Sequence, residues 1–382
     1  MKKIVLASAI SALFAAPVAA FAQAKPPAAP TLDKVFEASG ITESGYIDAG
    51  YTYSNRAIDP NQPGAGVNTR VFDAQNNSFA LHQLGVTLAK QPKEGFGGLV
   101  NLTVGKDAEV VHSFPEPNDS VATGSTMFDV TQAYLQYATG ALTVIGGKYT
   151  TLAGTEVIAS PSNNNVSRSM LFGAVPFTHT GLRATWAASD SLSLIAGVNN
   201  GWDQLTDANR NKTAELGVTW NPVKPLTIAG SFYDGTEPTG ATTNGSRSLV
   251  DLVASWAFTD ALSVGLEYLT FSQDNALAGG GKAKYSGYAG YFTWLLNPKW
   301  RLAVRAESFD DHDGFHFGTT GLATPGTKYT EGTATIAFLA ADNFEVRAEV
   351  REDKANQAVF KQYDGTTSKT LMTMALQGLY KF

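Results

Sequence analysis

From about residue 44 onward, apolar and polar residues alternate along the chain with a period of two. In one such segment Trp300, Leu302 and Val304 share one face, while Arg301 and Arg305 lie on the other. This is the period of a β-strand whose two faces meet different environments. Helical periodicity is almost absent from the same region, so the sequence predicts an all-β protein.

Sixteen alternating segments follow one another, and the connections between them alternate in length. The segments begin near residues 44, 78, 96, 128, 141, 178, 191, 212, 225, 247, 261, 284, 300, 328, 344 and 368. Short turns such as 91–94 alternate with long loops, of which 150–177 is the longest. This arrangement is typical of a transmembrane antiparallel up-and-down barrel with short periplasmic turns and long extracellular loops. The sheet must close, because open edges cannot be satisfied in hydrocarbon.

Composition narrows the classes of function. The chain has 382 residues, of which 16% are charged and 11% aromatic, with a formal net charge of -6 and no cysteine. The absence of cysteine excludes disulfides, thiol nucleophiles and cysteinyl metal sites. The negative charge argues against nucleic acid as a partner, because phosphate binding needs a concentrated positive surface.

The N-terminal region differs from the rest of the chain. Lys2 and Lys3 precede an apolar stretch that ends in small residues, so residues 1–22 read as a secretory signal peptide. Residues 23–43 are predicted to form a Pro-rich linker and a short helix, and residues 44–382 the barrel. We therefore expect export through the inner membrane and localisation in the outer membrane of a Gram-negative bacterium, in contact with lipid and lipopolysaccharide.

Aromatic residues gather near the predicted short turns and at the C-terminus. We expect them to form a girdle at the periplasmic interface of the membrane. The predicted girdle consists of Tyr137, Trp186, Trp220, Trp256, Trp294, Trp300, Tyr380 and Phe382. The terminal Phe382 closes an alternating apolar strand and resembles the signal that the barrel assembly machinery recognises.

The longest loop, residues 150–177, contains apolar residues that an exposed loop does not need. We expect it to fold into the lumen and to narrow the pore. The side chains it is expected to present there are Glu156, Asn163, Asn164, Asn165 and Arg168. The alternative is an external loop that packs on its neighbours.

The polar face of the strands supplies the predicted pore wall, where field and diameter decide what passes. Its residues are Asp48, Gln83, Asn101, Gln132, Gln136, Arg183, Glu215, Asp251, Glu267, Arg305, Glu307, Glu331, Glu345, Arg347 and Glu349. Arg305, Glu331 and Glu349 lie on neighbouring strands, so a ladder of alternating charges is expected, either setting a transverse field or only solvating the wall. The excess of acids favours cations, whereas Arg168 in the loop opposes this preference.

Other chemistry has weak support. Asp203 and Asp207 have the oxygen ligands of a Ca²⁺ site but a spacing that favours turns and caps. A solvated loop contains further side chains that could hold a transition metal, namely Asp310, Asp311, His312, Asp313 and His316. No nucleophile motif or zinc helix is present. We expect no enzyme, no metal and no cofactor.

Several stretches resemble one family, the OmpL-like β-barrel porins. They are residues 44–51, 77–79, 146–149, 154–158, 167–169, 176–183, 200–203 and 207–209. The resemblance covers essentially the whole chain after the signal and implies an outer-membrane pore for small polar solutes. Porins of this size are often trimers, so a homotrimer is expected by analogy. A sealed barrel acting as an adhesin or anchor through its long loops, and an outer-membrane hydrolase, remain as alternatives.

Overall fold

The computed structural model describes residues 31–56, 68–74, 77–113, 127–239, 243–317 and 325–382. Two compact units are present, residues 1–40 and 41–382. The first contains helix α1 (Leu32–Ser39), where the sequence predicts a short helix. The predicted signal peptide and most of the Pro-rich linker lie outside the described residues. Within the described part of the chain, the helices are too short or too polar to cross a membrane as helices.

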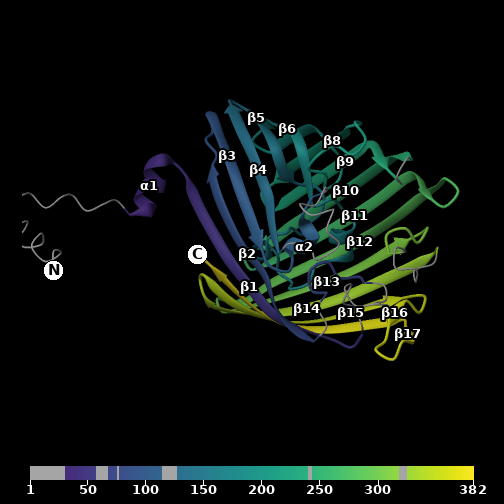
Figure 1. The fold of residues 1–382 in the computed structure, drawn as a ribbon. Helices are drawn as coiled ribbons and strands as arrows, with labels where there is room; N and C mark the ends of the chain where they lie inside the picture. The colour runs from purple at the N-terminus through teal and green to yellow at the C-terminus, as the bar shows by residue number, and fades with distance from the viewer. Residues whose placement is uncertain (1–30, 57–67, 75–76, 114–126, 240–242, 318–324) are drawn as a thin grey trace, which may run out of the picture. The chain divides into compact units, whose positions relative to one another are not determined.

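The second unit is a closed barrel of sixteen antiparallel strands (Figure 1). In chain order these are β1 (Thr42–Ser54), β2 (Ser78–Lys90), β3 (Gly95–Val104), β4 (Phe128–Thr139), β5 (Leu142–Thr150), β6 (Thr178–Ser189), β7 (Leu192–Asn199), β8 (Thr213–Val223), β9 (Leu226–Pro238), β10 (Asn244–Thr259), β11 (Leu262–Leu277), β12 (Gly281–Asn297), β13 (Trp300–Asp311), β14 (Thr327–Ala341), β15 (Phe344–Ala355) and β18 (Thr370–Lys381). Each strand pairs with its neighbours, and β1 closes the sheet against β18.

The predicted barrel is confirmed, and no predicted strand start differs from the structure by more than three residues. β10 and β12 begin three residues before the predicted starts near 247 and 284, so the loops that precede them are only 239–243 and 278–280. A small hairpin, β16 (Phe360–Lys361) and β17 (Thr367–Ser368), occupies the loop before β18. Each of its strands has two residues, which is too short to produce an alternating pattern in the sequence.

Alternation along each strand separates an inner face from an outer face. On β15, Val350 is 44% exposed and points outward, while its neighbour Arg351 is fully buried. An apolar exposed face beside a polar enclosed one is the reverse of a soluble core, and it is the arrangement expected of a wall between hydrocarbon and an aqueous interior.

Two bulges interrupt the alternation inside the strands. Between β1 and β2 the register skips His82, and between β3 and β4 it skips Thr131. Each bulge therefore turns two consecutive polar residues inward: His82 with Gln83, and Thr131 with Gln132. A bulge re-aims side chains in this way because one strand carries an extra residue.

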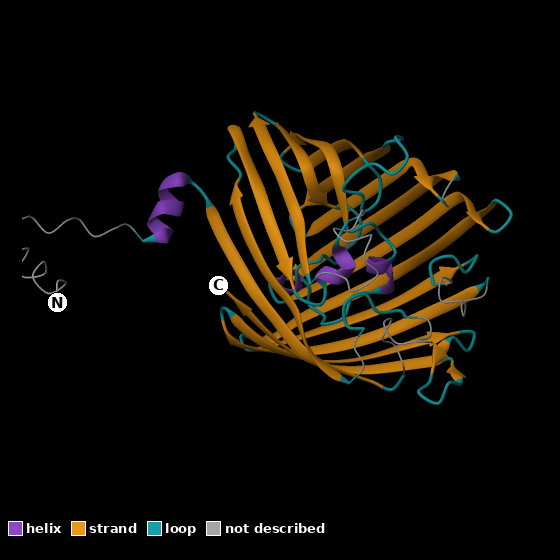
Figure 2. Cartoon of the chain, in the orientation of Figure 1, coloured by secondary structure: helices purple, strands orange, loops and turns teal. Residues whose placement is uncertain are grey.

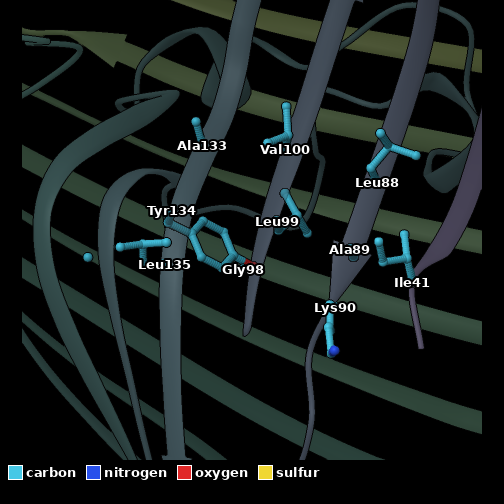
Figure 3. Close-up of a pocket in the computed structure, with 11 residues that line it drawn as sticks. Ile41, Leu88, Ala89, Lys90, Gly98, Leu99, Val100, Ala133, Tyr134 and Leu135 are labelled. Atoms are coloured by element: carbon cyan, nitrogen blue, oxygen red, sulfur yellow. The ribbon is translucent and has the colours of Figure 1, made fainter. Parts of the chain in front are cut away.

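The outer face has a shallow hollow across β2, β3 and β4 (Figure 3). Leu88, Val100 and Leu135 stand on three neighbouring strands, and Gly98 and Gly146 leave the floor open between them. The surface is almost entirely apolar, so it belongs to the membrane-facing side of the wall.

The eight aromatic residues of the predicted girdle lie on the outer face near the short-turn end. Each side chain is at least one-third exposed; Trp256 is the least exposed of the eight and Phe382 the most. Trp300 contacts the ring of Phe338 on the paired strand, with centroids 5.0 Å apart. The sixth tryptophan, Trp202, lies inside the barrel, where its ring contacts Phe271 and Arg247.

Candidate functional site

The segment between β5 and β6, residues 151–177, contacts inward-facing side chains of β10 to β15 and is called the lumen loop. It contains the 3₁₀ turn η1 (Ser160–Ser162) and the short helix α3 (Met170–Gly173). Figure 2 shows helical segments in the middle of the barrel, surrounded by strands. Another short helix, α2 (Ala108–Val111), follows β3.

Carboxylates from the wall hold the backbone of the lumen loop at its beginning. Asp251 accepts the Gly154 N–H at 2.8 Å, and Glu267 accepts the Thr155 N–H at 3.0 Å. Gly154 has φ = 92°, a left-handed conformation that favours glycine. These two hydrogen bonds fix the direction in which the loop leaves β5.

The second half of the lumen loop is held in the same way. Glu349 accepts the N–H groups of Val166 and Ser167 at 2.6 and 2.9 Å. Glu307 accepts the Met170 N–H at 2.8 Å, at the N-terminus of α3. Four acids on four different strands thus bind loop amides, so these acids, which were predicted to line the pore, are engaged with the loop.

Apolar contacts accompany these hydrogen bonds. Met170 and Leu171 are almost fully buried in a cluster with Phe309, Tyr285 and other inward-facing rings. Burial of such side chains stabilises by about 2 kcal/mol each. The lumen loop is therefore packed against the wall of β12 and β13 as well as hydrogen-bonded to it.

A buried arginine lies at the centre of the attachment. The Nη1 of Arg305 on β13 is 2.7 Å from Glu156 Oε1, and its Nε is 3.2 Å from Glu331 Oε2. The same guanidinium donates to the carbonyl oxygen of Ser167 at 2.9 Å. Arg351 adds a further contact with Glu331, at 3.5 Å. The charged residues on β13 to β15 therefore form a cluster of ion pairs that also includes Glu156 of the lumen loop. Such pairing is what the second interpretation of the charge ladder describes, in which the charges only solvate the wall.

The orientation predicted for the lumen loop side chains is wrong for Asn163, Asn165 and Arg168, whereas Glu156 lines the cleft described below. Glu156, Asn163, Asn165 and Arg168 are buried, and Asn164 alone of the five is exposed. The Arg168 guanidinium donates to the backbone oxygens of Val157, Ile158 and Val166, and so it binds the loop itself. The sequence shows an arginine in a loop, but these carbonyl partners exist only after the loop has folded.

All fifteen predicted wall residues lie on the inner face. Thirteen are buried, while Asn101 and Gln132 are half-buried. Arg183 pairs with Glu215, Gln377 donates to Asp48, and Gln83 donates to Asp107. The predicted preference for cations rested on the excess of acids on this wall. In the structure these acids contact arginines, amides and the lumen loop.

A second segment reaches the interior, and sequence reasoning missed it. Residues 69–73 lie in what was expected to be a plain external loop, yet Arg70 is buried against Asp353, with Nη2 2.8 Å from Oδ2. The ring of Phe72 lies 5.5 Å from that of Phe172. An apolar pair, Val71 and Phe72, within a polar loop was the available signal.

A cleft remains on the side away from these attachments. It has a volume of about 380 Å³ and lies between the lumen loop and the wall of β3, β4 and β5. Strand β4 is opposite β12 in the sixteen-strand order, so the cleft faces the wall to which the loop is bound. Its lining includes Asn101, Thr131, Gln132, Thr150, Val157 and Phe177.

The candidate metal residues have other partners. Asp203 accepts the N–H groups of Phe177 and Thr178, and burial raises the pKa of Asp203 to about 6. Asp207 accepts the N–H of Asn209, as a turn-forming aspartate does. No cluster of metal-binding side chains is found among the described residues.

A closed sixteen-strand barrel with an apolar outer face, an aromatic end and a polar interior defines the class of outer-membrane channel proteins. The family model described as "beta-barrel porin-2, OmpL-like" matches residues 40–380, and the chain belongs to this family. It is therefore an outer-membrane porin, and its fold and family are those of a channel.

Solved structures share the fold at low sequence identity. The outer-membrane channel DcaP of Acinetobacter baumannii has a TM-score of 0.62 at 11% identity, covering 90% of this chain and 97% of that one. OmpT of Vibrio cholerae has a TM-score of 0.58 at 11% identity, covering 90% of this chain and 97% of that one. It has also been solved in a trimer form. The anion-selective porin from Comamonas acidovorans has a TM-score of 0.56 at 11% identity, covering 90% of this chain and 99% of that one. No curated protein sequence matches this chain.

Proposed function

We propose that this porin lets small hydrophilic solutes cross the outer membrane by passive diffusion down their concentration gradient. The observation that carries the proposal is the one-sided placement of the lumen loop. The loop is bound mainly to β10–β15, with further hydrogen bonds to Tyr233 on β9 and Gln83 on β2, and it leaves a cleft of about 380 Å³ beside β3–β5. A barrel of sixteen strands encloses more space than its own side chains fill. In this proposal the lumen loop is the constriction, and the chain has no catalytic role and needs no cofactor.

Swelling of proteoliposomes in neutral sugars of increasing size tests the proposal. The full chain, inserted and shown to be folded by its heat-modifiable migration, is expected to admit small sugars and to exclude those above a size limit. A folded barrel that admits none of them would contradict the pore. It would favour the alternative, a sealed barrel that acts as an adhesin or anchor through its long loops.

Further proposals concern assembly and partners. We propose that residues 1–22 are removed on export, that lipid and lipopolysaccharide surround the outer face, and that Phe382 is read by the assembly machinery. Phe382 is 59% exposed and pairs with Gly45 through two backbone hydrogen bonds, each 2.8 Å long. A homotrimer is proposed by analogy with OmpT, and cross-linking in native membranes tests it.

A further inference from the structure

We infer that the cleft between the lumen loop and β3–β5 selects small uncharged solutes that combine hydroxyl or amide groups with an apolar face, such as single sugars. The inference rests on the proposed pore function and names its substrate class. It follows from the chemistry of the two sides of the cleft and from the pairing of Glu156, the charged residue among the described lining residues, with Arg305.

The barrel side of the cleft offers neutral hydrogen-bonding groups. The bulge in β4 directs both Thr131 and Gln132 inward, and Asn101 stands beside Gln132 on β3. Asn101 donates through Nδ2 to Thr87 at 2.8 Å, while Gln132 accepts from Thr150 through Oε1 at 3.4 Å. The Asn101 Oδ1 acceptor and the Gln132 Nε2 donors have no protein partner in the described part of the chain. A solute hydroxyl can use both.

The loop side of the cleft is apolar. Val157 is 43% exposed, and Leu152, Ile158, Phe172 and Phe177 also line the space. A solute that passes between the two sides therefore meets hydrogen-bond partners on one face and hydrocarbon on the other. A sugar ring, with hydroxyls at its edge and C–H groups on its faces, matches this arrangement.

The charged residue that lines the cleft and the basic residues on the adjacent strands have ionic partners. Glu156 is paired with Arg305 at 2.7 Å. Lys148 lies 3.0 Å from Asp129 on the adjacent strand. On β6, Arg183 is bound to Glu215 through Nε at 3.0 Å.

An ion in the cleft would lose part of its water shell without meeting an opposite free charge among the described lining residues. Desolvation costs an ion far more than a neutral hydroxyl compound that exchanges its hydrogen bonds. The cleft holds about a dozen waters at ~30 Å³ each, so a molecule the size of one sugar displaces much of this water. Charge and not size alone then decides what enters.

Three solutes of nearly equal size provide the test: glucose, the anion gluconate and the cation glucosamine. In proteoliposomes that contain the full folded chain, swelling in glucose should be at least about fivefold faster than swelling in gluconate or in glucosamine. Equal rates for all three solutes would overturn the inference while leaving the pore intact. No swelling in any solute would instead remove the proposed function itself.

A charge placed in the cleft tests the location. Gln132→Glu keeps the size of the side chain and adds a negative charge to the lining, so entry of glucosamine relative to gluconate should rise about tenfold. The control is Gln136→Glu on the same strand and the same face, which bonds Pro92 near the short-turn end and does not line the cleft. This variant should change the ratio by less than about twofold. Equal changes in this ratio in the two folded variants would show that charge selection occurs outside the cleft. The comparison of glucose, gluconate and glucosamine in the native protein does not depend on either variant.

Discussion

The guanidinium of Arg305 lies 2.7 Å from the carboxylate of Glu156, and this pair joins strand β13 to a loop that is 149 residues earlier in the chain. Both side chains are buried, and Glu331 approaches the same guanidinium from β14. The pair ties the lumen loop, the proposed constriction, to one wall. The cleft that remains lies on the other side of the loop, beside β3–β5.

Arg305→Met should release the lumen loop and destabilise the barrel. Methionine fills a similar volume but leaves Glu156 buried without its arginine partner and leaves Glu331 only the longer contact with Arg351. Breaking a buried pair costs about 3–5 kcal/mol. Urea unfolding in lipid vesicles should show the loss in the free energy of unfolding, and swelling assays should show entry of sugars that the native protein excludes.

Lys328→Met is the matched control for this prediction. Lys328 on β14 also pairs with an acid, Asp310, at 3.0 Å, but its side chain is 65% exposed. An exposed pair contributes about 0–1 kcal/mol, so both stability and size limit should stay near those of the native protein. Similar losses in the two variants would show that the burial of Arg305 does not matter.

Gly154→Ala should loosen the start of the lumen loop. Gly154 has φ = 92°, and its N–H is bound by Asp251. A side chain strains this conformation by about 1 kcal/mol or more. Hydrogen exchange at the amides of Gly154 and Thr155 should then be faster. Gly332→Ala on β14, where the added methyl meets open space, should leave exchange unchanged. Equal rates at these amides in native and Gly154→Ala protein would refute the role of Gly154 in holding the start of the loop.

The strands could be predicted because their information is local. Alternation along β13 and β15 depends on residues two positions apart, and a lipid-facing wall requires it throughout. The bulges at His82 and Thr131 escaped, because a single inserted residue looks like an ordinary polar position in a sequence. Their effect on the cleft appears only when the partner strand is in place.

The site was predicted in part for a related reason. Apolar residues in the loop before β6 indicated that it folds inward, and the acids of the wall were found by their strand positions. The direction of Arg168 was not predicted, because its acceptors are backbone oxygens of the loop itself. Nor was the contact of Arg70 with Asp353, which joins residues far apart in the sequence.

Loop residues after β13 should respond to acid through His316. Its ring lies among those of Tyr285, Phe309 and Phe317, and burial lowers the pKa of His316 to about 4 from an ordinary 6.5. Because the folded-state pKa is lower than the unfolded one, the stabilisation is complete above pH 6.5 and is lost as the pH falls toward 4.

Hydrogen exchange at the amides of Phe315 and Phe317, corrected for the intrinsic pH dependence, measures this effect. These amides are bound by Asp311, which titrates as well. The comparison is therefore with His316→Phe, which keeps an aromatic ring but cannot take up a proton. The variant should lose less protection between pH 6.5 and 4 than the native protein, whereas identical losses would assign the response to Asp311.

Deleting residues 160–170 should widen the pore without opening the barrel. The deletion removes the amides that Glu349 binds and the Arg168 side chain, whose guanidinium donates to carbonyl oxygens of the loop. None of the backbone pairs that close the sheet belong to this segment. Larger sugars should enter, and conductance in planar bilayers should rise. Deleting residues 364–366, the exposed turn between β16 and β17, removes chain at the loop end without touching the lumen loop and should leave both unchanged. An unchanged size limit in a folded 160–170 deletion would place the constriction in another part of the chain.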